Sequence, residues 1–564
     1  MPEWKPIGVR SLEQDALLAI KDTNNCLVEA GPGSGKTELL TQKLDYLFST
    51  EKSLEPKKIL ALSFKKDAAE NLKIRVKQRY GNEFARRFTS LTFAAFEKRI
   101  LNQFLMSLPL DVRPNKEYII VNKKNSDGKN KITYKDITRL SNEIIKKNVY
   151  IKRSIGLTYD FVFIDEFQDT TAAQYELLKE CFLKTDTKLT AVGDKNQAIM
   201  RWAGADPDIF DKFIIDFRAK KYYLGVNYRS SPKLVEFQKH FLQVAFALNQ
   251  DIVVGNLGDF IDGDIRLNNY DCDITEAVQL ANDISNKVGL GVSPSEICIL
   301  VKQKAGEYGN KIIEKLKIKG INSRIEDDYQ DMLKNPVISL ILAMILISGG
   351  QKDANAWENI TKFFMSEDSR DDISGDGYSY DDYYSEIESI IKNIKKLIAS
   401  DIICKTDMND LIIRIFNIIN TKIVDFSYRA YMNETELSVL LKKFALSFYI
   451  EYIKSNKSWV NAVENFKGEN SIPIMTIHKS KGLEFEHVYL IGLEDKAFWS
   501  FHKDREENLN AIFVAISRAK NSFTFTYSQK RNSIVQSNSK INEIYNIIRD
   551  SGLVVEQFYQ QDLL

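Results

Sequence analysis

The chain has 564 residues, of which 44% are hydrophobic and 27% charged, and its formal net charge is +1. This composition is typical of a globular protein of roughly three or four domains, and it excludes a protein that binds nucleic acid through overall positive charge alone. The five cysteines are scattered without a Cys-x-x-Cys pair, which argues against a zinc ribbon, an iron–sulfur cluster or a disulfide framework and favours a reducing, cytoplasmic compartment.

An apolar run, Cys26 to Val28, precedes a glycine-rich loop that opens into a segment with helical spacing. A strand, such a loop and a helix in this order form a phosphate-binding site, because backbone N–H groups and the helix N-terminus face the phosphates. Lys36 would reach the β- and γ-phosphates, and the hydroxyl of Thr37 would bind Mg²⁺. A glycine-rich turn without a ligand is the alternative for the loop taken alone. The residues of the loop are Ala30, Gly31, Pro32, Gly33, Ser34, Gly35, Lys36 and Thr37.

Apolar strands and helical segments alternate through the rest of the first half. A helix is expected over 9–20, ahead of the loop, and a polar, lysine-rich stretch indicates a small inserted subdomain at about 105–150. The further strands expected in this half cover residues 58–64, 89–93, 161–166 and 188–194. Alternation of this kind predicts a parallel α/β sheet.

A second α/β run begins near Leu224 and ends in a tail, after about Lys530, that predicts one or two helices. Its long interruption contains an acidic segment, 367–388, which is most simply a solvated surface loop; a partner-docking or DNA-mimicking segment is the alternative. The most apolar segment, Val337 to Ser348, is too short to span a bilayer and predicts a buried helix, so we expect no membrane contact. The expected domain bounds are 1–104 and 151–223 for the first α/β domain, 105–150 for its insertion, 224–349 and 471–564 for the second domain, and 350–470 for a helical insertion in it.

Two carboxylates, Asp165 and Glu166, end the apolar strand at 161–166. A nucleotide hydrolase needs such a pair beside its phosphate loop: Asp165 would bind Mg²⁺, and Glu166 would polarise the attacking water. Two carboxylates at a solvated strand end are the alternative for an isolated Asp-Glu pair. The full run DEFQDT, residues 165–170, is more specific.

Eight motifs between Gln14 and Lys520 together resemble those of UvrD/Rep-type superfamily 1 DNA helicases, in the order of that family. They are Gln14 in the leading helix, AGPGSGKT at 30–37, LSFKKDAAENLKIRV at 62–76, FIDEFQDT at 163–170, VGDKNQAIMRWAGAD at 192–206, LGVNYRS at 224–230, TIHKSKGLEFEHV at 476–488 and FVAISRAK at 513–520. The resemblance implies two RecA-like parallel-sheet P-loop domains, each with a mainly helical inserted subdomain, and an enzyme that couples hydrolysis of ATP, with Mg²⁺, to movement on DNA.

The resemblance also implies contacts with ATP at matched positions outside the loop and the two carboxylates. They are Gln14 at the adenine edge, Gln197 as the γ-phosphate sensor, Tyr228 stacked on the adenine, Arg229 near the γ-phosphate, Arg518 as the arginine finger and Glu484 at the ribose or phosphate side. ATP would then lie between the two domains and draw them together. Taken singly, Gln14 is more simply a surface residue and Tyr228 a half-buried aromatic residue.

For DNA, Phe64 and Trp202 match positions that stack on single-stranded bases. Thr92 and His478 match positions that contact the DNA backbone or couple the DNA and ATP sites. Stacking suits a motor because it accepts any base. As single residues, Phe64 and Trp202 would more simply belong to the core, and His478 would be a structural histidine.

Several positions depart from the family pattern. Glu38 follows the loop where the family has a guanidinium that covers the adenine, so the grip on the base is expected to be weaker. Met200 and Ala203 replace an aromatic residue and an arginine on either side of Trp202, and Leu509 and Asn510 replace a basic pair. The ATPase residues are therefore intact, whereas the set of DNA-contacting residues is smaller.

The insertions are also short, and no nuclease signature follows Lys520. This compact plan is similar to that of the helicase-like subunits of Gabija anti-phage systems, in which a separate nuclease subunit is the partner. We expect a 3′-to-5′ motor on single-stranded or tailed duplex DNA. A regulatory ATPase subunit that senses nucleotide and DNA with little or no unwinding is the alternative, and a P-loop metabolic kinase is excluded by the contexts of Asp165 and Arg518.

Overall fold

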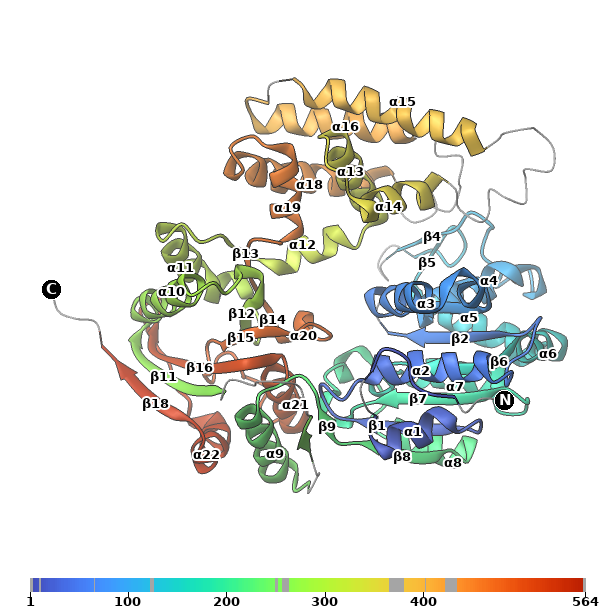
Figure 1. Cartoon of the computed structure of the whole chain (residues 1–564), viewed down its shortest axis with the longest axis horizontal. Helices are drawn as coiled ribbons and strands as arrows, with labels where there is room; N and C mark the ends of the chain where they lie inside the picture. The colour runs from blue at the N-terminus through green and yellow to red at the C-terminus, as the bar shows by residue number, and fades with distance from the viewer. Residues whose placement is uncertain are drawn as a thin grey trace.

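The computed structural model describes residues 4–9, 12–64, 66–121, 126–248, 252–255, 263–364, 380–400, 402–420 and 434–560. These residues form two large parallel sheets side by side and a helical unit above them (Figure 1). The parallel α/β class expected from the alternating pattern is confirmed. Residues 367–379 of the acidic segment lie outside the described residues, so its predicted exposure stays a prediction.

The first sheet has the strand order β3-β2-β6-β7-β1-β8, and each neighbouring pair is parallel. Its strands are β1 (Cys26–Ala30), β2 (Lys58–Ser63), β3 (Phe88–Thr92), β6 (Tyr159–Ile164), β7 (Lys188–Gly193) and β8 (Lys220–Leu224). Leu27 packs into one apolar cluster and its neighbours Cys26 and Val28 into another, so helices cover both faces of the sheet. The carboxyl ends of the strands therefore form the part of the sheet that is left open to a ligand.

Helices of the first half pack on these two faces. They are α1 (Gln14–Lys21), α2 (Lys36–Ser49), α3 (Lys66–Arg87), α4 (Phe93–Gln103), α5 (Tyr134–Lys147), α6 (Val149–Thr158), α7 (Ala172–Phe182) and α8 (Ile209–Phe217). Helix α1 begins at Gln14, so the start predicted at residue 9 was wrong. Within 105–150, α5 packs on α4 beside the short paired strands β4 (Ile119–Ile120) and β5 (Lys131–Ile132).

The second sheet has the order β13-β14-β12-β15-β16-β11-β18. Its strands are β11 (Asp264–Cys272), β12 (Ile297–Val301), β13 (Ser323–Ile325), β14 (Ile472–Thr476), β15 (Phe485–Leu490), β16 (Ala519–Arg531) and β18 (Val555–Tyr559), with β17 (Ile534–Val535) antiparallel to β16. The tail predicted to hold only helices contains α22 (Asn542–Asp550) but ends in β18, which pairs with β11. A strand between the sheets, β9 (Val226–Asn227), pairs with β10 (Val253–Val254).

The helices that pack around the second sheet come from both parts of the second half. They are α9 (Pro232–Phe246), α10 (Asp273–Gly289), α11 (Ala305–Ile318), α12 (Glu326–Leu333), α20 (Ile477–Ser480) and α21 (Arg505–Ile516).

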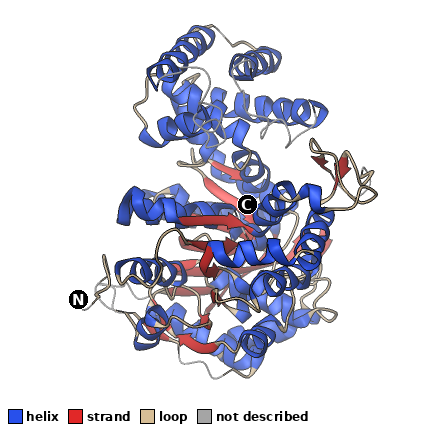
Figure 2. Ribbon diagram, turned by 90° about the vertical axis from the view of Figure 1, so that its right-hand side faces the viewer, coloured by secondary structure: helices blue, strands red, loops and turns tan. Residues whose placement is uncertain are grey.

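The helical unit leaves the second sheet after β13 and returns to it at β14. It lies at the top of Figure 2, where its part of the molecule is drawn in helices without strands. Since β13 and β14 are neighbours, with Ser323 opposite Ile472, both ends of the unit meet at one sheet edge. Its helices are α13 (Pro336–Ser348), α14 (Ala354–Phe364), α15 (Tyr380–Ile398), α16 (Lys405–Asn420), α18 (Glu434–Lys454) and α19 (Trp459–Lys467).

The apolar helix α13 packs into the core of this unit, which begins at Met332, earlier than the expected boundary at 350. This burial explains its composition, because a helix that is apolar on all sides needs partners on all sides. Among the described helices, none has the length and apolarity needed to cross a membrane.

Candidate nucleotide and DNA site

The glycine-rich loop joins β1 to the first turn of α2. Gly33 and Gly35 have φ angles of 69° and 81°, and Gly35 is the N-cap residue of α2, so the loop takes the left-handed turns that glycine permits. Lys36 lies across the loop and donates from Nζ to the carbonyls of Ala30 and Gly31, at 3.1 and 3.0 Å. Burial lowers the pKa of Lys36, which means that its charge has too few compensating partners and that an anion would stabilise it.

The carboxylates Asp165 and Glu166 follow β6, which lies two places in the sheet order from β1, the strand that leads into the phosphate loop. Glu166 has a left-handed φ of 52°, a strained conformation for a residue with a side chain and one that is concentrated at functional sites. Burial and repulsion by Glu166 raise the pKa of Asp165. Burial would raise the pKa of Glu166 too, but the charges of Lys481 and Lys36 outweigh it and lower that pKa.

These electrostatics bear on the predicted Mg²⁺ site. Asp165 is a buried carboxyl whose charged form is disfavoured, and the Thr37 hydroxyl belongs to the neighbouring loop. A hydroxyl and a carboxylate are hard oxygen ligands that suit Mg²⁺ when phosphates complete the coordination, so the residues fit the ion. Among the described residues, no group of three or more His, Cys, Asp or Glu side chains is placed to hold a metal by itself.

Gln197 connects the first sheet to the second. Its Nε2 donates to Asp194 Oδ2 at 2.7 Å, and its Oε1 accepts from Nη2 of Arg518 at 2.9 Å. Arg518 also donates to the carbonyl oxygens of Leu483 and Val514. Burial, followed by repulsion from Arg229, lowers the pKa of Arg518 to about 9, so this guanidinium also lacks compensating negative charge.

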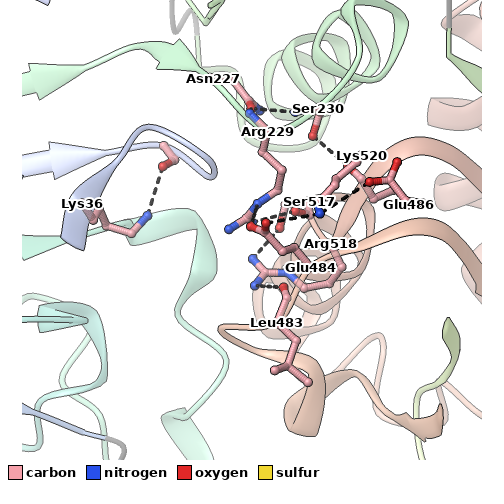
Figure 3. Close-up of polar contacts among 12 residues, drawn as sticks. Lys36, Asn227, Arg229, Ser230, Leu483, Glu484, Glu486, Ser517, Arg518 and Lys520 are labelled. Carbon is pink, nitrogen blue, oxygen red and sulfur yellow. Dashed lines mark hydrogen bonds and ion pairs between the residues drawn. The ribbon is translucent and has the colours of Figure 1, made fainter. Parts of the chain in front are cut away.

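Arg229 faces the loop from the other side. It donates from Nε to Glu484 at 2.8 Å and from Nη1 to the carbonyl of Ser517 at 3.0 Å. In Figure 3, Lys36 and Arg229 point from opposite sides into the region between the two sheets. The loop touches this segment directly: a Cβ atom at Gly33 would lie 2.4 Å from Oδ1 of Asn227.

The residues predicted to lie near the adenine are Tyr228, Gln14 and Glu38, and in the part of the chain that the structure describes no hydrogen bond or ion pair joins them to one another as the phosphate-side residues are joined. Tyr228 is half-buried, donates its backbone N–H to the carbonyl of Gly33 at 2.9 Å, and packs its ring against Gly255. Gln14 is exposed in the first turn of α1. Glu38 is paired with Arg79 of α3 and lies 3.9 Å from a nitrogen of Arg75, so the substituted position still has guanidinium groups next to it. These arginines were missed from the sequence because α3 is separated from α2 by a strand.

Lys481 is a further residue at the site for which no role was predicted. It is buried and donates to Asp169 Oδ2 at 2.6 Å and to the carbonyl of Gln197 at 3.0 Å, and its Nζ lies 3.9 Å from Glu166. It thus joins the segment after β14 to the carboxylates after β6. Its position inside the motif at 476–488 was the available signal.

The residues predicted to bind DNA form two groups. Phe64 and Thr92 lie at the carboxyl ends of neighbouring strands, since Ser63 is opposite Thr92 in the sheet, and Thr92 also caps α4 through its hydroxyl. Trp202 is 71% exposed, and its ring meets that of His478 edge-on at 6.4 Å between centroids. The structure therefore brings Trp202 and His478 together from the two halves of the chain.

Comparison with known proteins gives a consistent result over the length of the chain. Residues 12–125 and 113–218 match the UvrD/REP helicase N-terminal domain, and residues 222–397 and 366–530 match the UvrD-like helicase C-terminal domain. The chain is 25% identical to a probable DNA helicase II homolog of Mycoplasma capricolum, over 88% of this chain and 81% of that protein. It is 24% identical to the ATP-dependent DNA helicase PcrA of Bacillus subtilis, over 93% and 83%. It is also 24% identical to the Gabija protein GajB of Bacillus cereus, over 94% and 98%.

Proposed function

Because the chain belongs to the UvrD/Rep family of ATP-driven DNA helicases, we propose that it moves 3′ to 5′ on single-stranded DNA and hydrolyses Mg²⁺-bound ATP between its two sheets. The observation that carries this proposal is the chain of contacts from Asp194 through Gln197 to Arg518, which joins the two sheets beside the phosphate loop. Lys36 is half-buried and Arg518 is buried, and the lowered pKa values of both cations favour a polyanionic ligand there.

In this proposal each side chain has a definite task. Lys36 and the loop N–H groups bind the phosphates, and Glu166 orients the attacking water and accepts its proton. Mg²⁺, held by Thr37 and Asp165, would neutralise charge on the phosphates. Arg229 and Arg518 belong to the second half of the chain, where Arg229 is held by Glu484 and Ser517, so they stabilise the developing charge only when the two halves are close together.

The coupling to movement follows from this geometry. Gln197 and Lys481 have partners on the opposite half of the chain, so a change at the phosphates alters contacts between the halves. A ligand that binds the closed arrangement more tightly shifts the population toward it, and loss of the ligand reverses the shift. Repeated closure and opening on a strand held by Phe64, Thr92, Trp202 and His478 would move the protein along DNA.

A second function is favoured by one observation, the match in length to GajB. The chain covers 98% of GajB but 83% of the B. subtilis PcrA protein. We therefore also propose that it works in a complex with a separate nuclease subunit in anti-phage defence. In its strictest form this alternative is a nucleotide- and DNA-sensing subunit with little or no unwinding activity.

The decisive experiment is performed on the purified full chain. ATP hydrolysis is measured with and without a single-stranded oligonucleotide, and unwinding is measured on duplexes with a 3′ or a 5′ tail. The motor requires DNA-stimulated hydrolysis and unwinding from the 3′ tail only. Hydrolysis that ignores DNA until a nuclease subunit is added would overturn the autonomous motor and leave the sensing subunit.

A further inference from the structure

Two exposed tryptophans border one pocket on the face that carries Trp202 and His478. Trp202, in the turn Arg201–Ala203, is 71% exposed, and Trp499, in the loop between β15 and α21, is 68% exposed. Both line a pocket of about 370 Å³ that His478 also lines. This volume lies at the small end of the range of about 300–1,000 Å³ for ligand pockets, so a single small ring system would fill it.

The exposure of these two side chains contrasts with the other tryptophans of the chain. Trp4 donates its indole N–H to Asp45, Trp459 donates to the carbonyl of Ile398, and Trp357 stacks on Tyr384. An indole in water has a high free energy because its large apolar faces are hydrated, so exposed aromatic residues that share one pocket indicate a ligand with a flat apolar face.

The charges in the pocket decide what kind of ligand that is. Lys302, Asp504 and Glu507 line it, and burial of Lys302 lowers its pKa to about 8. Two carboxylates against one ammonium disfavour a phosphate group. The two carboxylates provide hydrogen-bond acceptors and the ammonium group of Lys302 provides a donor, and the polar edge of a nucleobase requires both.

The pocket is assembled from both halves of the chain. The carboxylate of Glu507, on α21, accepts a hydrogen bond from the backbone N–H of Trp202, and Trp202 meets His478 edge-on. Next to Trp202, an ion pair joins Arg201 to Glu506. The positions of the two indoles relative to each other therefore depend on how the two halves approach.

We propose that Trp499 is a second stacking residue and that, with Trp202, it binds one unstacked base of single-stranded DNA in this pocket. This inference rests on the proposed function and adds a residue that none of the eight motifs contains. It also explains how the chain can have Met200 and Ala203 where the family has an aromatic residue and an arginine. Trp499, from the other half of the chain, would supply the stacking surface that these two substitutions remove beside Trp202.

The test measures binding of a 5′-fluorescein-labelled oligo(dT) by anisotropy in fixed salt. Trp499→Ala is expected to weaken binding by about 5- to 150-fold, the range for loss of stacking on one base, whereas Trp499→Phe should retain most of the affinity. If both indoles hold the same base, the double variant with Trp202→Ala will lose less than the product of the two single losses. Phe558→Ala, which removes a 73% exposed ring on β18, is the matched control and should bind as the wild type does.

The outcomes separate this inference from the proposed function. Wild-type binding that Trp202→Ala weakens and Trp499→Ala does not would overturn the role of Trp499 and leave the motor intact. Failure of the wild type to bind DNA would overturn both. If Trp499→Ala lowers the melting temperature by several degrees, the test uses Trp499→Phe and Trp499→Leu instead. Both side chains fill the space, but only Phe can stack on a base. Equal affinity of these two variants for the oligonucleotide would overturn the proposal.

Discussion

At the residue scale, Lys36 and Glu166 have different tasks in the proposed hydrolysis, and their substitution should separate binding from turnover. Lys36→Ala removes the cation that lies across the phosphate loop, so we expect ATP binding and turnover both to be lost. Glu166→Gln keeps the size of the side chain but removes the base, so turnover should fall by roughly 10²- to 10⁴-fold while ATP remains bound. Steady-state hydrolysis and binding of a fluorescent ATP analogue check both.

The matched controls are exposed residues of the same type, Lys135→Ala and Glu117→Gln, which should hydrolyse ATP at the wild-type rate. Wild-type turnover in Glu166→Gln would contradict the mechanism. Unchanged binding in Lys36→Ala would contradict the role of the loop.

Glu38 and Arg79 support a second prediction at this scale. Since Glu38 holds Arg79 next to the helix that follows the phosphate loop, Arg79 is expected to supply the cation that the family places at residue 38 itself. Arg79→Ala should raise KM for ATP several-fold with a smaller change in kcat, because stacking on the adenine contributes to the ground state and the transition state alike. Michaelis–Menten kinetics test this, and Arg139→Ala, an exposed arginine of α5, is the control.

The double exchange Glu38→Arg with Arg79→Glu sharpens the test, because it retains the pair and puts the guanidinium where the family has it. A KM near the wild-type value in the exchanged protein is the expected result. A KM that stays unchanged in Arg79→Ala would show that this arginine does not reach the base.

The residues found from the sequence and those missed differ in where their partners lie. Lys36 and Asp165 were predictable because loop and strand end carry their own local pattern. The surroundings of Lys481 and Trp499 were not, because they come from residues more than 250 positions away along the chain: Lys481 donates to Asp169, and Trp499 lines a pocket with Trp202. The pairing of Glu38 with Arg79 likewise could not be predicted from the sequence, because it depends on how α2 and α3 pack together.

At the element scale, the packing of α4 on α5 leaves one carboxylate poorly solvated. Glu97 of α4 is 2% exposed; its Oε2 accepts from the Thr138 hydroxyl at 2.7 Å, and its Oε1 has no hydrogen-bond partner among the described residues. Burial raises the pKa of Glu97 to about 7. The folded protein therefore favours protonated Glu97, so the contribution of Glu97 to the free energy of unfolding is fully present below pH 4.5 and is lost as the pH rises through about 7.

A shift of this size corresponds to a loss of about 3 kcal/mol above pH 7. Glu97→Gln should therefore unfold at a higher temperature than the wild type at pH 8 and at a similar temperature at pH 5. Thermal melting at the two pH values tests this, with the exposed Glu117→Gln as the control. The prediction would be contradicted if the difference in melting temperature between Glu97→Gln and the wild type were the same at pH 8 as at pH 5.

The elements that the sequence mispredicted also depend on distant partners. The strand β18 has few local signals, and it forms because β11 offers an open edge in the second sheet. Helix α3 (Lys66–Arg87) is interrupted at Gly81, whose φ of 82° is non-helical and suits glycine, so it consists of two helical segments joined at a kink. Strands buried on both faces, by contrast, were recognisable from their continuous apolar runs.

At the scale of the whole molecule, the ATP residues and the two tryptophans are connected through contacts between the halves. Arg201 lies between Gln197 and Trp202 in sequence and forms a two-point ion pair with Glu506 on α21, the helix that leads to Arg518. Asn510 of the same helix donates to the carbonyl of Ala198 at 3.2 Å. A DNA strand bound at Trp202 would therefore be only a few residues from Gln197, the proposed γ-phosphate sensor.

Arg201→Ala should consequently lower the stimulation of ATP hydrolysis by single-stranded DNA more than it lowers hydrolysis without DNA. The pair is partly exposed, so its contribution is modest, about 0.5–1 kcal/mol, which corresponds to a 2- to 5-fold lower stimulation. The ratio of the hydrolysis rates with and without oligo(dT) measures this effect, and Glu506→Gln should give the same change because it removes the other half of the pair. If Arg201→Ala lowers the ratio and Glu506→Gln does not, Arg201 contacts DNA directly, and coupling through α21 is contradicted.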